Sequence, residues 1–141
     1  MLFRSDGENL GPSDLVAGHD SYGAANWKHP SYDDSWWAVD AAPLGYGDIF
    51  GTTIQTTLSY GPNPLMKYRT TYFRRHFTVT ESGRFSSLRL RLMRDDGAIV
   101  YLNGHEIAHS DFPAGTTTVR SNTFATAASG SNRSAEHTSE L

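Results

Sequence analysis

The chain has 141 residues, 15 acidic side chains against 12 lysines and arginines, and no cysteine. This length is typical of one domain with its own core, and the lack of thiols excludes disulfides, thiolate metal sites and a cysteine nucleophile. With a net charge of −3 and no basic run, the sequence predicts no nucleic-acid partner. No apolar stretch approaches the roughly 20 residues of a membrane helix, so no membrane insertion is expected.

The first half of the chain predicts loops with few strands. Residues 6–26 are rich in Gly, Ser and Asp and are expected to form a loop. Residues 27–46 contain all three tryptophans, and residues 32–37 predict a turn that places one tryptophan in the core. Residues 52–60 are rich in Thr and predict a strand.

The second half predicts strands in close succession. Residues 70–79 are aromatic and β-branched, and residues 88–92 alternate Leu with Arg, as in a strand with one buried face. Residues 98–102 continue this pattern, and Asn103-Gly104 is typical of a tight hairpin turn with two positive φ angles. These segments predict an antiparallel meander in which Asp95-Asp96-Gly97 forms the first turn.

Short strands separated by Gly and Pro, without a long amphipathic helix pattern, predict an all-β antiparallel β-sandwich. A further weak strand is expected over residues 116–127. Roughly six or seven strands are expected, against about eight in a jelly-roll. The count therefore favours an incomplete sandwich.

The two ends of the chain are typical of sequence added to a natural one. Residues 133–141 closely resemble a read-through translation of a short-read sequencing adaptor, and residues 1–5 resemble the other adaptor in a similar frame. We expect both segments to lie outside the fold, the tail to be disordered, and a single domain over residues 6–132. An ordinary polar tail is the alternative interpretation of the C-terminal segment.

An ordered set of residues resembles a known family. The set comprises Trp27, Tyr32-Asp33-Asp34-Ser35, Trp37 and residues 43–48, 59–63, 71–75, 95–104 and 113–115. Over about residues 21–129 it resembles the galactose-binding-like jelly-roll modules of secreted or surface multidomain proteins of bacteria. Residues 72–75 and 100–104 are also similar to the sugar-binding-type N-terminal domain of family 2 glycoside hydrolases. The resemblance implies an extracellular or cell-surface location. It also implies a further pair of C-terminal strands that closes the sandwich, and we expect this chain to lack them.

Exposed aromatic rings are the usual platforms for sugars, so the tryptophans and tyrosines are candidate glycan contacts. Trp37 fits the buried tryptophan of the family, whereas Trp36 stands where a small polar residue is more typical. We therefore predict a ligand-binding patch formed by Trp36, Tyr46 and Asp48. Core packing is the alternative for most of these rings.

Asp95 and Asp96 are candidate ligands for a structural calcium ion, because adjacent carboxylates in a tight turn offer hard oxygen atoms. The protective-antigen-type lectin barrels have a similar turn. A plain Asp-Gly turn, or neutralisation of the pair by Arg75 or Arg94, is the alternative.

His105-Glu106-Ile107-Ala108-His109 matches the H-E-x-x-H pattern of zinc proteases, which requires a helix. Here it follows a hairpin turn and is expected in a strand, where His105 and His109 stand about 13 Å apart. Glu106 is then expected on the opposite sheet face.

The sequence thus predicts a non-catalytic accessory module for carbohydrate attachment or structural spacing, beside other domains of its parent protein. One alternative is a fragment of a glycoside hydrolase or phosphoesterase whose catalytic domain lies elsewhere. A remote alternative is a zinc-dependent hydrolase that uses His105, Glu106 and His109. Fold resemblance alone does not decide among these functions.

Overall fold

The computed structural model describes residues 2–4, 27–46, 53–61, 63–65, 68–94, 96–112, 123–126 and 133–140. In these ranges the protein is rich in strands and has almost no helix, as predicted for an all-β protein. Its elements are β1 (Leu2–Arg4), β2 (Ala38–Val39), β3 (Leu44–Gly45), β4 (Thr56–Thr57), β5 (Tyr72–Arg74), the 3-10 turn η2 (Ser82–Arg84), β6 (Ser87–Arg94), β7 (Ala98–Leu102), β8 (His105–Ser110) and β9 (Arg133–Glu140).

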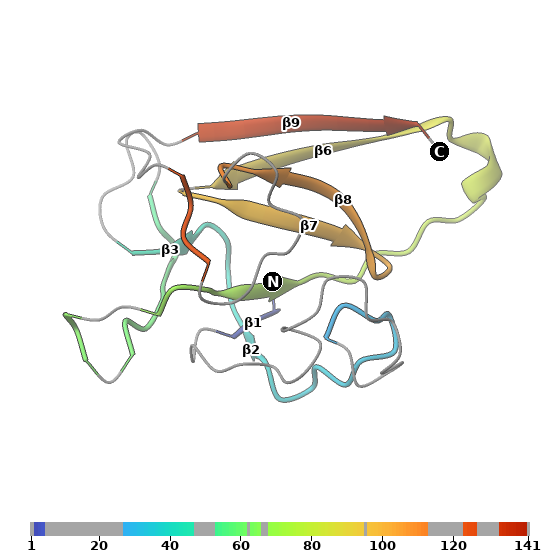
Figure 1. Cartoon of the computed structure of the whole chain (residues 1–141). Helices are drawn as coiled ribbons and strands as arrows, with labels where there is room; N and C mark the ends of the chain where they lie inside the picture. Colours follow the sequence, from blue (N-terminus) through green and yellow to red (C-terminus); the bar gives the residue numbers. More distant parts are fainter. Residues whose placement is uncertain are drawn as a thin grey trace.

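The strands pair in small sheets. β1 lies between β2 and β5 in an antiparallel sheet, and β3 pairs with β4 in parallel. β6 pairs with β9 and β7 with β8, both antiparallel. Figure 1 shows these two long pairs in the upper part of the molecule and β1 and β2 in the lower part.

The predicted meander is correct for one hairpin and wrong for the other. β7 and β8 pair closely around the turn of Asn103 and Gly104, whose φ angles of 51° and 90° are the positive values that this turn needs. β6 pairs with β9 along all eight of its residues instead of with β7. Alternation of Leu and Arg shows that a strand is present and which face it buries, but it does not specify the neighbouring strand.

The C-terminal segment forms a strand where the sequence predicts disorder. Arg133–Glu140 pairs with β6 from Ser87↔Glu140 to Arg94↔Arg133, and Leu2–Arg4 near the other end forms β1. Pairing of this kind uses backbone N–H and C=O groups, which every residue except proline supplies. A polar segment can therefore complete a free strand edge without apolar side chains.

Two other predicted strands are shorter than expected. The strand predicted at 70–79 covers only Tyr72–Arg74, because its partner β1 has three residues. The strand predicted at 52–60 covers only Thr56–Thr57. Of the weak strand expected at 116–127, residues 123–126 contain no strand and the others lie outside the described residues, as does the loop expected at 6–26.

The core of the described part is small and aromatic. Trp37, Leu58 and Tyr72 are buried, so the predicted burial of one tryptophan from residues 32–37 is confirmed. Trp27 contacts Tyr72 of β5 and Tyr101 of β7 edge to face, with ring centroids 4.9 and 5.7 Å apart. This one indole therefore joins the β5 sheet to the β7–β8 hairpin.

Candidate ligand-binding loop

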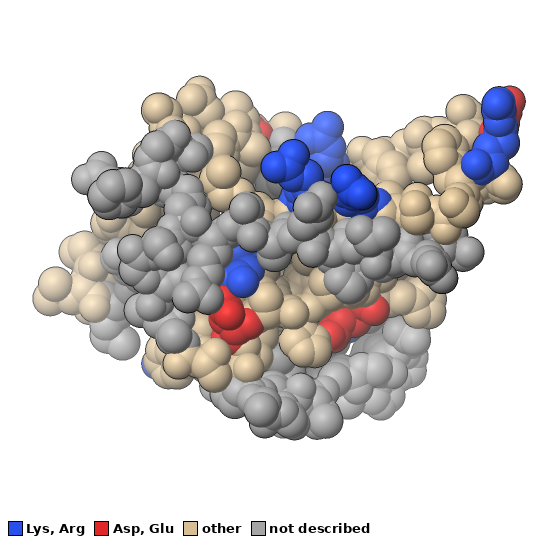
Figure 2. Space-filling model, turned by 90° about the horizontal axis from the view of Figure 1, so that it is seen from above, with Lys and Arg blue, Asp and Glu red and all other residues tan. Residues whose placement is uncertain are grey.

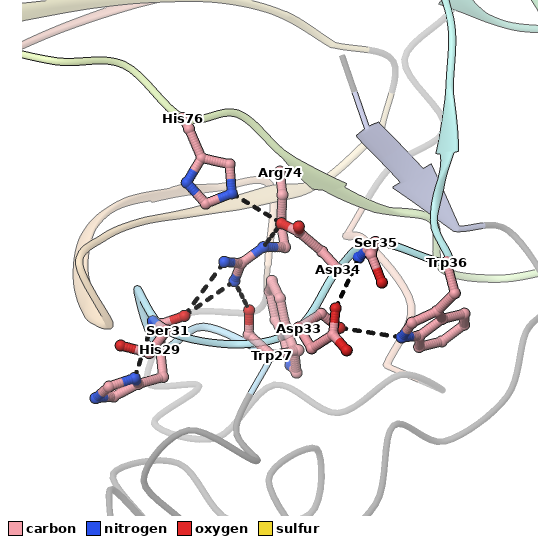
Figure 3. A network of polar contacts seen from close by, with 9 residues as sticks. All are labelled: Trp27, His29, Ser31, Asp33, Asp34, Ser35, Trp36, Arg74 and His76. Atoms are coloured by element: carbon pink, nitrogen blue, oxygen red, sulfur yellow. Dashed lines mark hydrogen bonds and ion pairs between the residues drawn. The ribbon is translucent and has the colours of Figure 1, made fainter.

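Residues 27–37 follow an irregular path that Arg74 of β5 holds in place. The Nε atom of Arg74 donates a hydrogen bond to Asp34 Oδ2 at 2.7 Å, and its guanidinium also donates to the backbone carbonyls of Trp27 and His29. The side chains of Arg74 and Asp34 are only 10% and 15% exposed. Figure 3 shows the guanidinium of Arg74 directed at Asp34 and at the carbonyls of Trp27 and His29.

A histidine completes the charge network around Asp34. His76 follows β5 in the chain, and its Nε2 atom lies 2.9 Å from Asp34 Oδ2 (Figure 3). Burial raises the pKa of Asp34, but the hydrogen bonds and positive charges of His76 and Arg74 lower it more, so the pKa lies below its usual value. Asp34 therefore stays ionised at neutral pH.

The same loop presents one tryptophan to solvent. Trp36 is 53% exposed, and its indole N–H donates to the carbonyl of Asp33 at 3.0 Å. Its ring packs edge to face on Trp37, which is 4% exposed, with 6.2 Å between centroids. The side chain of Asp33 accepts a hydrogen bond from Ser35 N, and hydrogen bonding to Ser35 lowers the Asp33 pKa. The exposed indole is thus held in a defined orientation.

The other two residues of the predicted patch are placed less completely. Tyr46 is half-buried and packs edge to face against Tyr60, with 4.9 Å between centroids. Asp48 lies outside the described residues. Trp36 thus has the exposure expected of a glycan contact, while the patch as a whole stays a prediction.

The predicted calcium turn is described only in part, because Asp95 lies outside the described residues. Asp96 is exposed with φ of 63°, and its carbonyl accepts a hydrogen bond from Arg94 at 2.9 Å. Arg94 also pairs with the carboxylate of Asp111. Figure 2 shows the acidic side chains of the face in view as small separate groups rather than one broad acidic field. Among the described residues, there is no group of three or more His, Cys, Asp or Glu side chains that could hold a metal ion.

The zinc-protease pattern lies on β8, in the strand conformation predicted for it. One detail of that prediction is wrong: Glu106 shares a face with His109, and Glu106 Oε1 lies 2.7 Å from His109 Nδ1. The pairing register shifts between Val100 and Tyr101, and this irregularity changes the alternation of side chains along β8.

Sequence reasoning did not find the cluster of Asp34, Arg74 and His76. Asp34 is separated from the other two by 40 and 42 positions, and no spacing rule connects a turn to a strand at that distance. The turn that contains Asp34 and the strand that contains Arg74 both belong to the set of residues that resembles the jelly-roll modules. This shared resemblance was the sequence signal that could have connected them.

Comparison of the chain with protein-family models, with curated proteins and with solved structures gives no significant match. In the described part of the chain, no helix has the length and apolar character needed to cross a membrane. The site is therefore interpreted from its own geometry.

Proposed function

We propose that this chain is a non-catalytic accessory module of the galactose-binding-like jelly-roll kind, which attaches an extracellular bacterial protein to carbohydrate. The observation that supports this proposal is the exposed indole of Trp36 on a loop held by Arg74. Sugars have apolar C–H faces and polar edges, and a large aromatic ring with nearby polar groups complements both.

The order of the loop matters for affinity, because binding loses free energy when it immobilises a mobile side chain or loop. The indole N–H bond to Asp33 and the packing on Trp37 already restrict Trp36 before a ligand arrives. A weak stack on one ring can then give measurable binding.

Calorimetric titration of the full chain with neutral oligosaccharides of galactose, glucose and xylose tests the proposal. We expect Trp36→Ala to abolish binding and Phe85→Ala, which removes a similarly exposed ring beside η2, to leave it intact. Equal binding by both variants would contradict a role for Trp36. If no oligosaccharide binds the unmodified chain, the proposal of carbohydrate attachment is wrong.

We also propose calcium as a structural ion at Asp95 and Asp96. A ligand that binds only the folded state adds about 2.7 kcal/mol at 100 times its Kd, which raises the melting temperature by several degrees. Thermal unfolding with millimolar Ca²⁺ and then with excess chelator tests this, with Asp96→Asn as the variant that should lose the shift. A melting temperature that does not respond to Ca²⁺ excludes the ion.

The zinc-hydrolase alternative has no support from the geometry of β8. The H-E-x-x-H pattern binds zinc when both histidines lie on one face of a helix, whereas here the motif lies in a strand.

A further inference from the structure

An extra residue in β8 changes which side chains share a face. Val100 pairs with Ala108 and Tyr101 with Glu106, so Ile107 has no partner of its own on β7. In a regular strand, residues three apart point to opposite faces. The unpaired Ile107 removes one step of this alternation and places Glu106 and His109 on the same face.

The two side chains meet at a solvent-accessible point. His109 Nδ1 lies 2.7 Å from Glu106 Oε1, and the side chains are 57% and 44% exposed. His105 pairs with Leu102, the position next to Tyr101, and therefore belongs to the opposite face. The H-E-x-x-H sequence is thus divided into one close pair and one separate histidine.

We propose that Glu106 and His109 form a surface site for a divalent transition-metal ion, Zn²⁺ or Cu²⁺. An imidazole nitrogen and a carboxylate oxygen are ordinary ligands of these ions. Two ligands about 2.0–2.2 Å from a tetrahedral zinc lie roughly 3.3–3.6 Å apart, so the exposed pair must separate by less than about 1 Å to admit the ion. Within the described residues no third His, Cys, Asp or Glu joins them, and water completes the coordination.

Titration of the full chain with Zn²⁺ and with Cu²⁺, followed by calorimetry, tests the site. Even outer-shell partners of metal ligands contribute about 10- to 100-fold to affinity, so His109→Ala and Glu106→Gln should each weaken binding at least tenfold. His105→Ala is the matched control and should leave the affinity within about twofold, because its side chain is on the other face. The affinity order of the first-row metals predicts tighter binding of Cu²⁺ than of Zn²⁺.

A helical zinc-protease site, in contrast, requires both His105 and His109 as zinc ligands. A loss on His105→Ala as large as that on His109→Ala would therefore overturn the proposal. Absence of binding at millimolar Zn²⁺ and Cu²⁺, or binding that persists in both ligand variants, would also overturn it.

The role of the irregularity itself can be tested by deleting Ile107, which should restore regular alternation and separate the two ligands while keeping both in the chain. We expect loss of metal binding with the hairpin amide signals retained in the NMR spectrum. Retained binding would refute the role of the bulge. If the deletion prevents folding, Zn²⁺ titration of the unmodified chain followed at the histidine ring signals decides: His109 should shift and His105 should not.

Discussion

Arg74 is the residue on which the loop of residues 27–37 depends. It contacts one carboxylate and two backbone carbonyls of that loop, all from a side chain that is almost fully buried. Removing one partner from a buried ion pair leaves the other charge without compensation, which costs far more free energy than the pair contributes. The loop should therefore be sensitive to this one position.

Replacement of Arg74 by Met should lower the free energy of unfolding by roughly 3 kcal/mol, because Asp34 stays buried without its main partner. Arg84→Met is the matched control: its ion pair with Glu81 is exposed and should contribute less than about 0.5 kcal/mol. Urea unfolding of both variants measures the difference. Similar small losses in both would show that Arg74 does not fix the loop.

Asp34 should also make stability depend on pH. The pKa of Asp34 in the folded chain lies below the unfolded value of about 3.9. Asp34 therefore stabilises the folded chain above the unfolded pKa, and this stabilisation is lost as pH falls through the folded pKa. The Asp34→Asn variant should therefore show a flatter decrease in unfolding free energy between about pH 5 and pH 3. Urea midpoints across this range measure the slope, and parallel curves would contradict the assignment.

At the scale of single residues, the sequence predicted which tryptophan is buried and which is exposed, because the resemblance places Trp37 in the core. It did not predict the contacts of Arg74 with the loop of residues 27–37. The partners of Arg74 are mainly carbonyl groups, and every residue has one, so no residue type marks them.

At the scale of elements, the β7–β8 hairpin is the part that follows most directly from local chemistry. Gly104 has φ of 90°, a region in which a Cβ atom is disfavoured. By contrast, Gly83 in η2 lies outside the positive-φ region, and the space that a Cβ atom would occupy there is open to 4 Å. The two glycines differ in conformation and not in crowding.

Gly104→Ala should therefore destabilise the chain by about 1–2 kcal/mol, since the nearest atom to its new Cβ is at 3.8 Å and only the backbone is strained. Gly83→Ala is the matched control and should be neutral or slightly stabilising. Denaturant midpoints compare the two. Equal effects would indicate that the turn does not need a positive φ at Gly104.

The hairpin could be predicted because its turn lies within two adjacent residues. The pairing of β6 could not, because β9 is more than 38 positions away and any strand with a free edge is a possible partner. The irregularity at Ile107 was equally hidden, since Ile is a common strand residue and no local signal marks an extra one.

At the scale of the whole molecule, Trp27 connects parts of the chain that are far apart in sequence. Its ring touches Tyr72 of β5 and Tyr101 of β7, and among the described residues only Trp37, Thr56, Leu58 and Tyr72 are buried. The all-β class was predictable from strand patterns, but this connection was not. Which sheets pack together depends on contacts that no single segment specifies.

Trp27→Ala should lower the free energy of unfolding by roughly 3 kcal/mol or more, because it opens a cavity between two sheets. Trp36→Ala should cost less than about 1 kcal/mol, since that ring is half exposed. Hydrogen exchange adds a local measurement: amides of β7 should lose protection in the first variant and keep it in the second. Equal losses in both variants would argue against Trp27 as the connection.

The contacts of Arg74 with backbone carbonyls also bear on how this protein tolerates change. A carbonyl is the same in every amino acid, so the path of the loop depends little on the exposed side chains at Ser31, Ser35 and Trp36. The path of this loop is therefore separable from the side chains that it presents, as in the variable loops of immune receptors on their rigid frames. A library randomised at these three positions should keep its frame.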